Sequence, residues 1–387
     1  MKKLLIFLII FICISGCVSA EEDSFRLIDE YSKMYGDEIE ESIDSLSGTE
    51  IKKLIPGFSA EEIISGLARG ENIFSIHGIG NKVLELFAGE IKATLKILIF
   101  VFAVGILCTY LTNIQSSFPK HGTIDTAFWV CYMVIAGILS AAFLEVVSCG
   151  KETISNLAVF MRTMAPVAMV TLAASGAVIS AGTFELIVMG VIEITQWILE
   201  YVFIPLIMMS AAMNLVHNLS ANLNAEKMVQ FMNKTTKWGI GIVMTLFVGV
   251  MGLQGIVSGS ADGLTVKVTK FAAANLIPLV GGALSETVET VMNCSVVIKN
   301  AVGVFGIILV VLIVAVPVIK IAACLIMFRL CAAVLQMVCD KRIVKCISEF
   351  ADSMSSIFAL VAVVAVMFII MITIIINAGN SAVLLGK

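Results

Sequence analysis

Four polar side chains recur along one face of an otherwise apolar segment of this 387-residue chain, and they could carry protons or ions. They are Glu185, Glu193, Gln196 and Glu200. At about 100° per residue, a helix places all four within an arc of about 80°. A carboxylate inside a membrane faces protein or water, where it is paired or protonated. Two readings stay open, namely structural polar contacts or a lined aqueous path that relays protons or ions.

Lysines and prolines in other apolar segments complete this candidate polar site. Lys299 and Lys320 are the expected partners of the carboxylates, because an ionic group in a membrane pairs with its opposite. Proline inside a helix removes a backbone hydrogen bond and crowds the preceding turn, so Pro205 and Pro317 predict kinks in two long spans. The candidate path therefore combines ionic side chains with helices that bend.

The chain lacks the sequence patterns of a catalytic or phosphate-binding site. It contains no H-E-x-x-H, G-x-S-x-G or G-x-x-x-x-G-K-[ST] motif, and its three histidines are far apart. The ten cysteines form no C-x-x-C pair. Four of them recur at seven or eight residues as one helical stripe, which predicts packing: Cys324, Cys331, Cys339 and Cys346. We therefore expect no enzymatic activity, cofactor, metal or nucleic-acid partner.

The composition defines the class of protein that holds these residues. Hydrophobic residues make up 59% of the chain, charged residues make up only 14%, and the mean hydropathy is +1.03. A soluble domain cannot expose such a surface, and apolar runs of about 20 residues are typical of membrane-spanning helices. The sequence predicts an all-α integral membrane protein.

The first 20 residues have the order of a secretory signal peptide. A basic start, Met1–Lys3, is followed by an apolar run too short to span a membrane comfortably. The small residues before Glu21 predict cleavage after Ala20. The alternative is a lipoprotein signal, which would leave a lipidated Cys17 as the first residue. Both readings place the following segment outside the cytoplasm.

Residues 21–90 are expected to form an extracytoplasmic helical region, separate from a polytopic membrane domain at 91–387. The first region has sixteen acidic and six basic residues, a net charge of −10, whereas 91–387 has a net charge of +4. A capping box that starts at Ser59 predicts a short helix ending near Gly70. The acidic faces are read as solvated surface or as a docking surface for another protein.

Six apolar segments are long enough to cross a hydrocarbon core of about 30 Å. They lie at about 92–112, 127–147, 184–213, 238–258, 299–330 and 354–377. With 21–90 outside, the cytoplasmic loops carry eight lysines and arginines, and the external loops between the spans carry four. Basic loops stay in the cytoplasm, so this excess supports six spans with the C-terminus outside.

Two further stretches, 151–183 and 262–290, decide whether the count stays at six. The first is apolar enough to cross, which leaves seven or eight helices open, whereas the second holds five charged residues. We read both stretches as interfacial or re-entrant elements, because irregular backbone is tolerated at membrane depth where protein or water covers it.

The chain contains a weak internal repeat. A shift of 112 residues lays 123–216 on 235–328. Four of the six prolines then come into register, Pro166 with Pro278 and Pro205 with Pro317. Each unit reads as a span, a turn at the first proline and a long span broken by the second. Repeats of this kind are common in transporters, and scaffolds can be duplicated too.

Glycines recur at four-residue spacing in the second repeat unit, before Pro278. They are Gly255, Gly259 and Gly263. In water each would weaken a helix by about 1 kcal/mol relative to alanine. In a membrane, small residues let helix backbones approach closely, so this spacing predicts a helix-packing face.

The run GLQGIVSGSADGLTVKVTKFAAANLIPLVGGALSETVETV, at 252–291, resembles the stage III sporulation protein AE family of endospore-forming Firmicutes, as does its continuation through Val297–Gly303. The resemblance extends to the layout of a signal peptide, a short external helical region and a polytopic C-terminal part. It covers most of the chain, and the 250–303 run is its most specific piece.

The resemblance implies a non-enzymatic, permease-like membrane component of the channel or secretion apparatus that joins mother cell and forespore and sustains late forespore gene expression. Implied partners are membrane lipid, the other stage III sporulation A-operon proteins, among them an ATPase and ring-forming proteins, and the stage II sporulation protein Q. The implied location is the mother-cell-derived outer forespore membrane. The alternative function is a stand-alone secondary transporter or permease with a site between the two repeats.

Overall fold

The computed structural model describes residues 60–69, 76–116, 122–219, 226–276 and 281–385. Within these residues the secondary structure is helical and there is no strand. The elements are α3 (Ala60–Arg69), α4 (Ile76–Ser116), α5 (Gly122–Ala174), α6 (Val178–Ile198), η1 (Leu199–Phe203), α7 (Ile204–Leu219), α8 (Glu226–Leu276), α9 (Gly281–Leu335) and α10 (Lys341–Leu385). The all-α prediction is confirmed.

Several predicted features lie outside the described residues. These are the signal peptide at 1–20 with cleavage between Ala20 and Glu21, the alternative lipidation at Cys17, most of the acidic region, and Pro278. They stay predictions.

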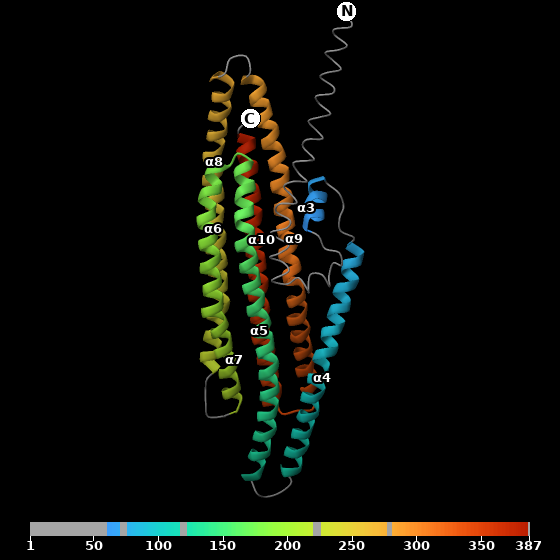
Figure 1. Ribbon diagram of the computed structural model, residues 1–387. Helices are drawn as coiled ribbons and strands as arrows, with labels where there is room; N and C mark the ends of the chain where they lie inside the picture. The colour runs from blue at the N-terminus through green and yellow to red at the C-terminus, as the bar shows by residue number, and fades with distance from the viewer. Residues whose placement is uncertain (1–59, 70–75, 117–121, 220–225, 277–280, 386–387) are drawn as a thin grey trace, which may run out of the picture.

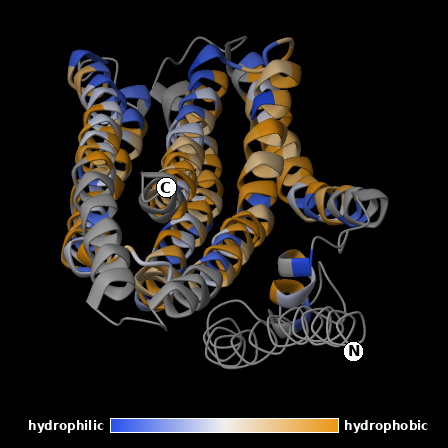
Figure 2. Ribbon diagram, turned by 90° about the horizontal axis from the view of Figure 1, so that it is seen from above, coloured by the Kyte–Doolittle hydropathy of each residue, from blue (hydrophilic) through white to orange (hydrophobic). Residues whose placement is uncertain are grey.

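The long helices run side by side along one axis (Figure 1). The chain descends through α4, rises through α5, descends through α6, η1 and α7, rises through α8, descends through α9 and rises through α10. Helix α10 packs against α5, α7, α8 and α9. Viewed along the axis, its C-terminal end lies among the other helices (Figure 2). The bundle is therefore assembled around its last helix.

Among the residues that the structure describes, six helices are long and apolar enough to cross a membrane, as predicted. The candidate spans are Leu84–Leu111, Phe128–Ala174, Val178–Asn218, Glu226–Ile256, Met292–Leu335 and Lys341–Ala378. Large apolar side chains point outward from them, including Leu186 at 80% exposed, Trp238 at 77% and Ile256 at 72%. An outer surface of this kind suits lipid rather than water.

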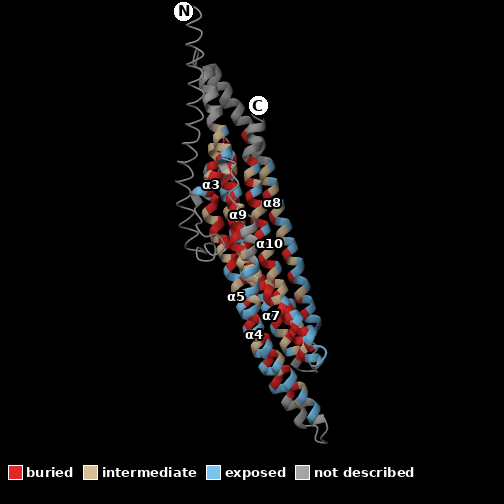
Figure 3. Ribbon diagram, turned by 90° about the vertical axis from the view of Figure 1, so that its right-hand side faces the viewer, coloured by how far each residue is buried: buried red, intermediate tan, exposed pale blue. Residues whose placement is uncertain are grey.

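The inner faces carry apolar residues at helical spacing. Along α10, buried side chains recur every three or four residues: Phe350, Met354, Ile357, Val361, Val364 and Phe368. Phe143 of α5 meets Phe350 edge-to-face, with the ring centroids 5.7 Å apart. Figure 3 shows buried residues on the sides of the helices that face one another. The spacing thus gives α10 a continuous buried face along its length.

Glycines bring neighbouring helices to α10. A Cβ at Gly150 of α5 would lie 2.6 Å from Cγ2 of Ile357. A Cβ at Gly255 of α8 would lie 3.0 Å from Cγ2 of Ile374, so the first glycine of the predicted packing face does meet another helix. Gly259 and Gly263 lie in α8, but their surroundings are outside the described residues. Close approach of this kind is how membrane helices associate.

The stretches 151–183 and 262–290, predicted as interfacial or re-entrant, form no separate elements within the described residues. Residues 151–174 continue α5, 262–276 continue α8, and 281–290 begin α9. The predicted turn at Pro166 is also absent, because this proline lies inside α5. Its side chain is exposed on the helix surface, so the helix loses a hydrogen bond at Pro166 without ending there.

The turn between α5 and α6 is made by Gly176 instead. Its φ of 91° lies in the left-handed region that favours glycine. The N–H of Ala177 donates to the carbonyl of Leu172 at 3.2 Å, and the N–H of Gly176 donates to that of Ala173 at 3.0 Å. These two hydrogen bonds form a Schellman motif, which satisfies carbonyls at the end of α5.

The two predicted repeat units both form helical hairpins that point the same way, α5 with α6–α7 and α8 with α9. Their turns do not superpose under the 112-residue shift. The first turn follows Ala174, whereas α8 already ends at Leu276, which corresponds to position 164 of the first unit. An ancestral duplication stays a prediction.

The other two prolines behave differently from each other. Pro205 follows η1, where the N–H of Ile204 donates to the carbonyl of Leu199, one residue further back than in an α-helix. A π-helical turn of this kind is a known cause of helix bending. Pro317 lies inside the continuous α9, so its kink stays a prediction.

The described part of the region predicted to be external is joined directly to the bundle. Helix α3 has the extent that the capping box predicts, and its Ile63 and Ile64 are buried. It packs against α9. Helix α4 runs through residue 90 without a break, so the boundary at 90/91 lies inside a helix.

The positions of the basic residues predict that the end of the bundle with the α7–α8 and α9–α10 connections faces the cytoplasm. Cysteine introduced at Met337, which is 88% exposed at this end, should gain maleimide labelling over the parent only in permeabilised cells. Cysteine introduced at Val178, 60% exposed at the opposite end, should be labelled in intact cells when the chain is expressed without sporulation. The reverse pattern would overturn the topology.

Candidate functional site

The predicted polar residues of α6 meet two basic residues of α5. Nε of Arg162 lies 2.6 Å from Oε1 of Glu193. This contact is electrostatic, since Nε makes no hydrogen bond of suitable geometry. Nη2 of the same guanidinium donates to Oε1 of Gln196. Arg162 therefore binds two of the four residues of the predicted stripe.

Glu200 meets the second basic residue about three helical turns away along α5. Nζ of Lys151 lies 2.8 Å from Oε1 of Glu200. The side chain of Glu200 is 17% exposed and that of Lys151 is 54% exposed. We call Lys151, Arg162, Glu193, Gln196 and Glu200 the α5–α6 charge ladder. The fourth residue of the predicted stripe, Glu185, is exposed on α6 about 12 Å along the axis from Glu193, at 1.5 Å per residue.

Helix periodicity explains why the ladder forms between α5 and α6. Lys151 and Arg162 are eleven residues apart, which returns a helix to within about 20° of the same direction. Glu193 and Glu200 are seven residues apart on an antiparallel neighbour. The two charged residues are farther apart along α5 than along the segment of α6 and η1. The π-helical turn η1 begins directly before Glu200. A π-turn shifts the direction of the residues that follow it.

The lysines predicted as partners of this stripe are engaged elsewhere. Nζ of Lys320 on α9 lies 2.9 Å from Oε1 of Glu145, a residue of α5 that the sequence analysis did not single out. Nζ of Lys299 donates to the carbonyl of Ile376 on α10 at 2.7 Å. The partner prediction is therefore wrong for both lysines, because α5 lies between α6 and α9 and supplies its own charges to each side.

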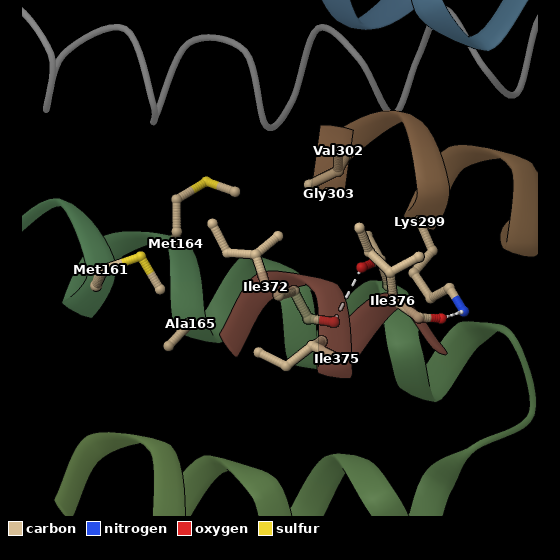
Figure 4. Close-up of a pocket in the computed structure, with 11 residues that line it drawn as sticks. Met161, Met164, Ala165, Lys299, Val302, Gly303, Ile372, Ile375 and Ile376 are labelled. Carbon is tan, nitrogen blue, oxygen red and sulfur yellow. Dashed lines mark hydrogen bonds between the residues drawn. The ribbon is translucent and has the colours of Figure 1, made fainter. Parts of the chain in front are cut away.

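Lys299 lies at a small cavity between α5, α9 and α10 (Figure 4). Its side chain is only 2% exposed. Apart from Lys299 and Thr171 the lining is apolar, with Met161, Met164 and Ile372 among the contributing residues. The cavity volume is about 20 Å³, which is room for about one water molecule. A metabolite does not fit this space, so Lys299 acts here as a tie between α9 and α10.

A buried carboxylate of α8 completes the turn between α5 and α6. Asp262 is 0% exposed. It accepts the backbone N–H groups of Ile179 at 3.0 Å and Ser180 at 3.2 Å. Helix α6 begins after Ala177, which has no capping side chain, so Asp262 satisfies these N–H groups from another helix. The negative charge also suits the positive end of the helix dipole.

A second polar cluster lies at the basic end of the bundle. Nδ2 of Asn218 donates to Oε2 of Glu349, and Nζ of Lys345 lies 3.8 Å from the other carboxylate oxygen. His217 Nε2 is 3.4 Å from the same lysine. Tyr132 donates to the carbonyl of Leu215 at 3.0 Å. These contacts fasten α7 to α5 and α10.

The predicted cysteine stripe is divided between two helices. Cys324 and Cys331 are buried in α9, which ends at Leu335, and Cys346 is buried in α10, which begins at Lys341. The Sγ of Cys324 lies 3.9 Å from the sulfur of Met354. Within the described residues, no group of three histidine, cysteine or acidic side chains could hold a metal ion.

The sequence alone predicts Lys151 and Arg162 only as basic residues of an external loop. Their spacing is the signal that could have identified them, because it places both on one face of a helix that faces the acidic stripe. Asp262 and Glu145 carry no such signal, since each depends on which helices become neighbours. The same holds for the contacts of Glu349.

The fold and this site define a class of protein: a polytopic, all-α membrane protein whose long helices are joined by polar ties. The chain belongs to the stage III sporulation protein AE family, whose model matches residues 58–379. It is similar to stage III sporulation protein AE of Bacillus subtilis strain 168, with 26% identity over 332 residues, 86% of this chain and 83% of that protein. No solved structure is similar enough to be matched. The membership supports a role in sporulation.

Replacing Asp262 by alanine should remove the acceptor for two N–H groups of α6 and lower stability by about 1–2 kcal/mol. The measurement is thermal unfolding of the purified full chain in detergent. Glu152→Ala, at an exposed acidic position of α5, is the matched control and should unfold like the parent. Equal stability of the two variants would contradict the capping role.

Proposed function

We propose that this chain is a non-enzymatic membrane component of the channel or secretion apparatus that links mother cell and forespore, and that late forespore gene expression requires it. The family match over residues 58–379 is the observation that carries this proposal, because it covers all six candidate spans together with α3. The similarity to the Bacillus subtilis protein extends over comparable shares of both chains. The proposal therefore concerns the whole membrane domain rather than one shared segment.

The geometry of the charge ladder supports a place in a larger assembly. Both ion pairs lie between helices that are apolar enough to cross a membrane, yet Glu193 is 60% exposed and Lys151 54%. Charged groups in such segments face protein or water rather than lipid. A face of this kind is expected in a protein that lines an aqueous path or contacts other membrane subunits.

The alternative is a stand-alone secondary transporter with a substrate site between the two repeats. Its site would lie where the α5–α6 and α8–α9 hairpins meet. The cavity beside Lys299, between α5, α9 and α10, holds about one water molecule. This volume gives a metabolite-sized site no support, so we favour the assembly component.

The location and partners follow from the same proposal. We place the chain in the mother-cell-derived outer forespore membrane, with its basic end in the mother cell. The helix α3 side of the bundle then faces the space between the two membranes. The expected partners are the other stage III sporulation A-operon proteins, including the ATPase and the ring-forming proteins, and the stage II sporulation protein Q.

Isolation of the tagged full chain from sporulating cells tests this assembly. We expect the operon's ATPase and ring-forming proteins to be enriched after mild cross-linking, relative to the same cells carrying an untagged chain. Identification of the captured proteins by mass spectrometry is the readout. Recovery of the chain without any of these proteins, from cells that sporulate normally, would contradict the proposal.

Exchange of Glu200 for glutamine tests whether the ladder serves an aqueous path. The amide keeps the size and a hydrogen-bond acceptor for Lys151, so the membrane level should stay normal while late forespore gene expression falls. Glu226→Gln, at an exposed position at the start of α8, is the matched control and should leave expression unchanged. Normal expression in Glu200→Gln cells would reduce the ladder to a packing contact.

A further inference from the structure

The outer face of α5 and α6 combines charge with open space for a neighbour. The ladder cation Arg162 is 35% exposed and its partner Glu193 is 60% exposed, although both lie in candidate membrane spans. Both charged side chains are therefore partly open on this face although each has an intramolecular partner. Because unpaired polar surface is unfavourable in hydrocarbon, this face needs a protein or water covering in the membrane.

Helix α6 has room for close contact on the same side. A Cβ added at Gly182 or at Gly190 would meet nothing within 4 Å. At about 100° per residue, both glycines and Glu193 fall within an arc of about 80°. Leu186 lies in the same arc and is 80% exposed. Small residues beside an exposed charge let another helix approach closely enough to reach that charge.

The order of charges on this face is complementary to itself. At each of two heights the ladder has one cation on α5 and one carboxylate on α6 or η1: Lys151 with Glu200, and Arg162 with Glu193. In two copies that have the same orientation in the membrane, corresponding ion pairs lie at the same depth. A twofold axis along the membrane normal then sets α5 of one copy opposite α6 of the other.

We propose that the α5–α6 charge ladder is a parallel twofold interface between two copies of this chain within the membrane. At each height the two intramolecular ion pairs then form a four-membered ring of alternating charge. Every cation gains a second carboxylate, and every carboxylate gains a second cation. This arrangement compensates the desolvation of the ions, which a single partner does only in part. The inference concerns self-association and goes beyond the proposed channel role.

Cysteine cross-linking of the full chain in membranes tests the interface directly. Cysteine at Leu186, on the proposed face, should give a cross-linked homodimer with a bifunctional maleimide. Cysteine at Leu246, 62% exposed on α8, is the matched control and should give monomer. Equal dimer yield from both positions, no dimer from Leu186→Cys, or cross-links only to a different protein would overturn the proposal.

Charge exchange separates an interface from a contact within one copy. Both charge exchanges are made in the Leu186→Cys background. Arg162→Glu alone makes all four charges negative in the ring formed by residues 162 and 193 of the two copies. Glu193→Arg alone makes all four charges of that ring positive. Each variant expressed alone should lose most of its cross-linked dimer. Co-expression of the two variants with different tags should restore a mixed dimer, because opposite charges then face each other across the axis. Failure of the mixed dimer, with both variants at normal membrane levels, would leave only an intramolecular role and sink the interface.

Discussion

A charged group inside an apolar helix bundle has to meet an opposite charge, a hydrogen-bonding group or water, and the arrangement of this protein depends on that constraint. Asp262 meets it through two backbone N–H groups of α6, and Lys299 through a carbonyl of α10. Glu200 meets it through Lys151 of α5. Each of these ties joins two different helices through residues that are about 50 to 80 positions apart. The polar groups therefore determine which apolar faces become neighbours, in addition to any role in function.

Packing supplies what the polar ties do not. Lipid is as apolar as the helix surfaces, so burial of apolar area gives little drive for helices to associate, and close fit has to supply it. Gly150 and Gly255 bring α5 and α8 to side chains of the central α10. The aromatic pair of Phe143 and Phe350 adds an edge-to-face contact between α5 and α10. The last helix of the chain is thus the element on which the others assemble.

The sequence predicted the polar stripe of α6 but not its partners. The stripe follows from local periodicity, which holds until the π-helical turn at Leu199–Phe203. The partners depend on neighbour choice, and α5 proved to supply charges to both α6 and α9. The turn was assigned to Pro166, whereas the structure makes it at Gly176. Proline marks where a helix loses a hydrogen bond, but the end of a helix also depends on where its carbonyls find other donors.

Composition and apolar run length were enough to predict an all-α membrane protein with six spans among the described residues, because these properties depend on the solvent and on local spacing alone. The family was predicted from the resemblance of the run at 252–291 and its continuation through Val297–Gly303. The tertiary structure decided how far α5 and α8 continue past their apolar cores, because Lys151 and Arg162 of α5 and Asp262 of α8 contact the segment that contains α6 and η1. It also decided that Asp262 caps α6 and that Lys299 binds α10, because a contact between residues about 80 positions apart is visible only once the helices are side by side.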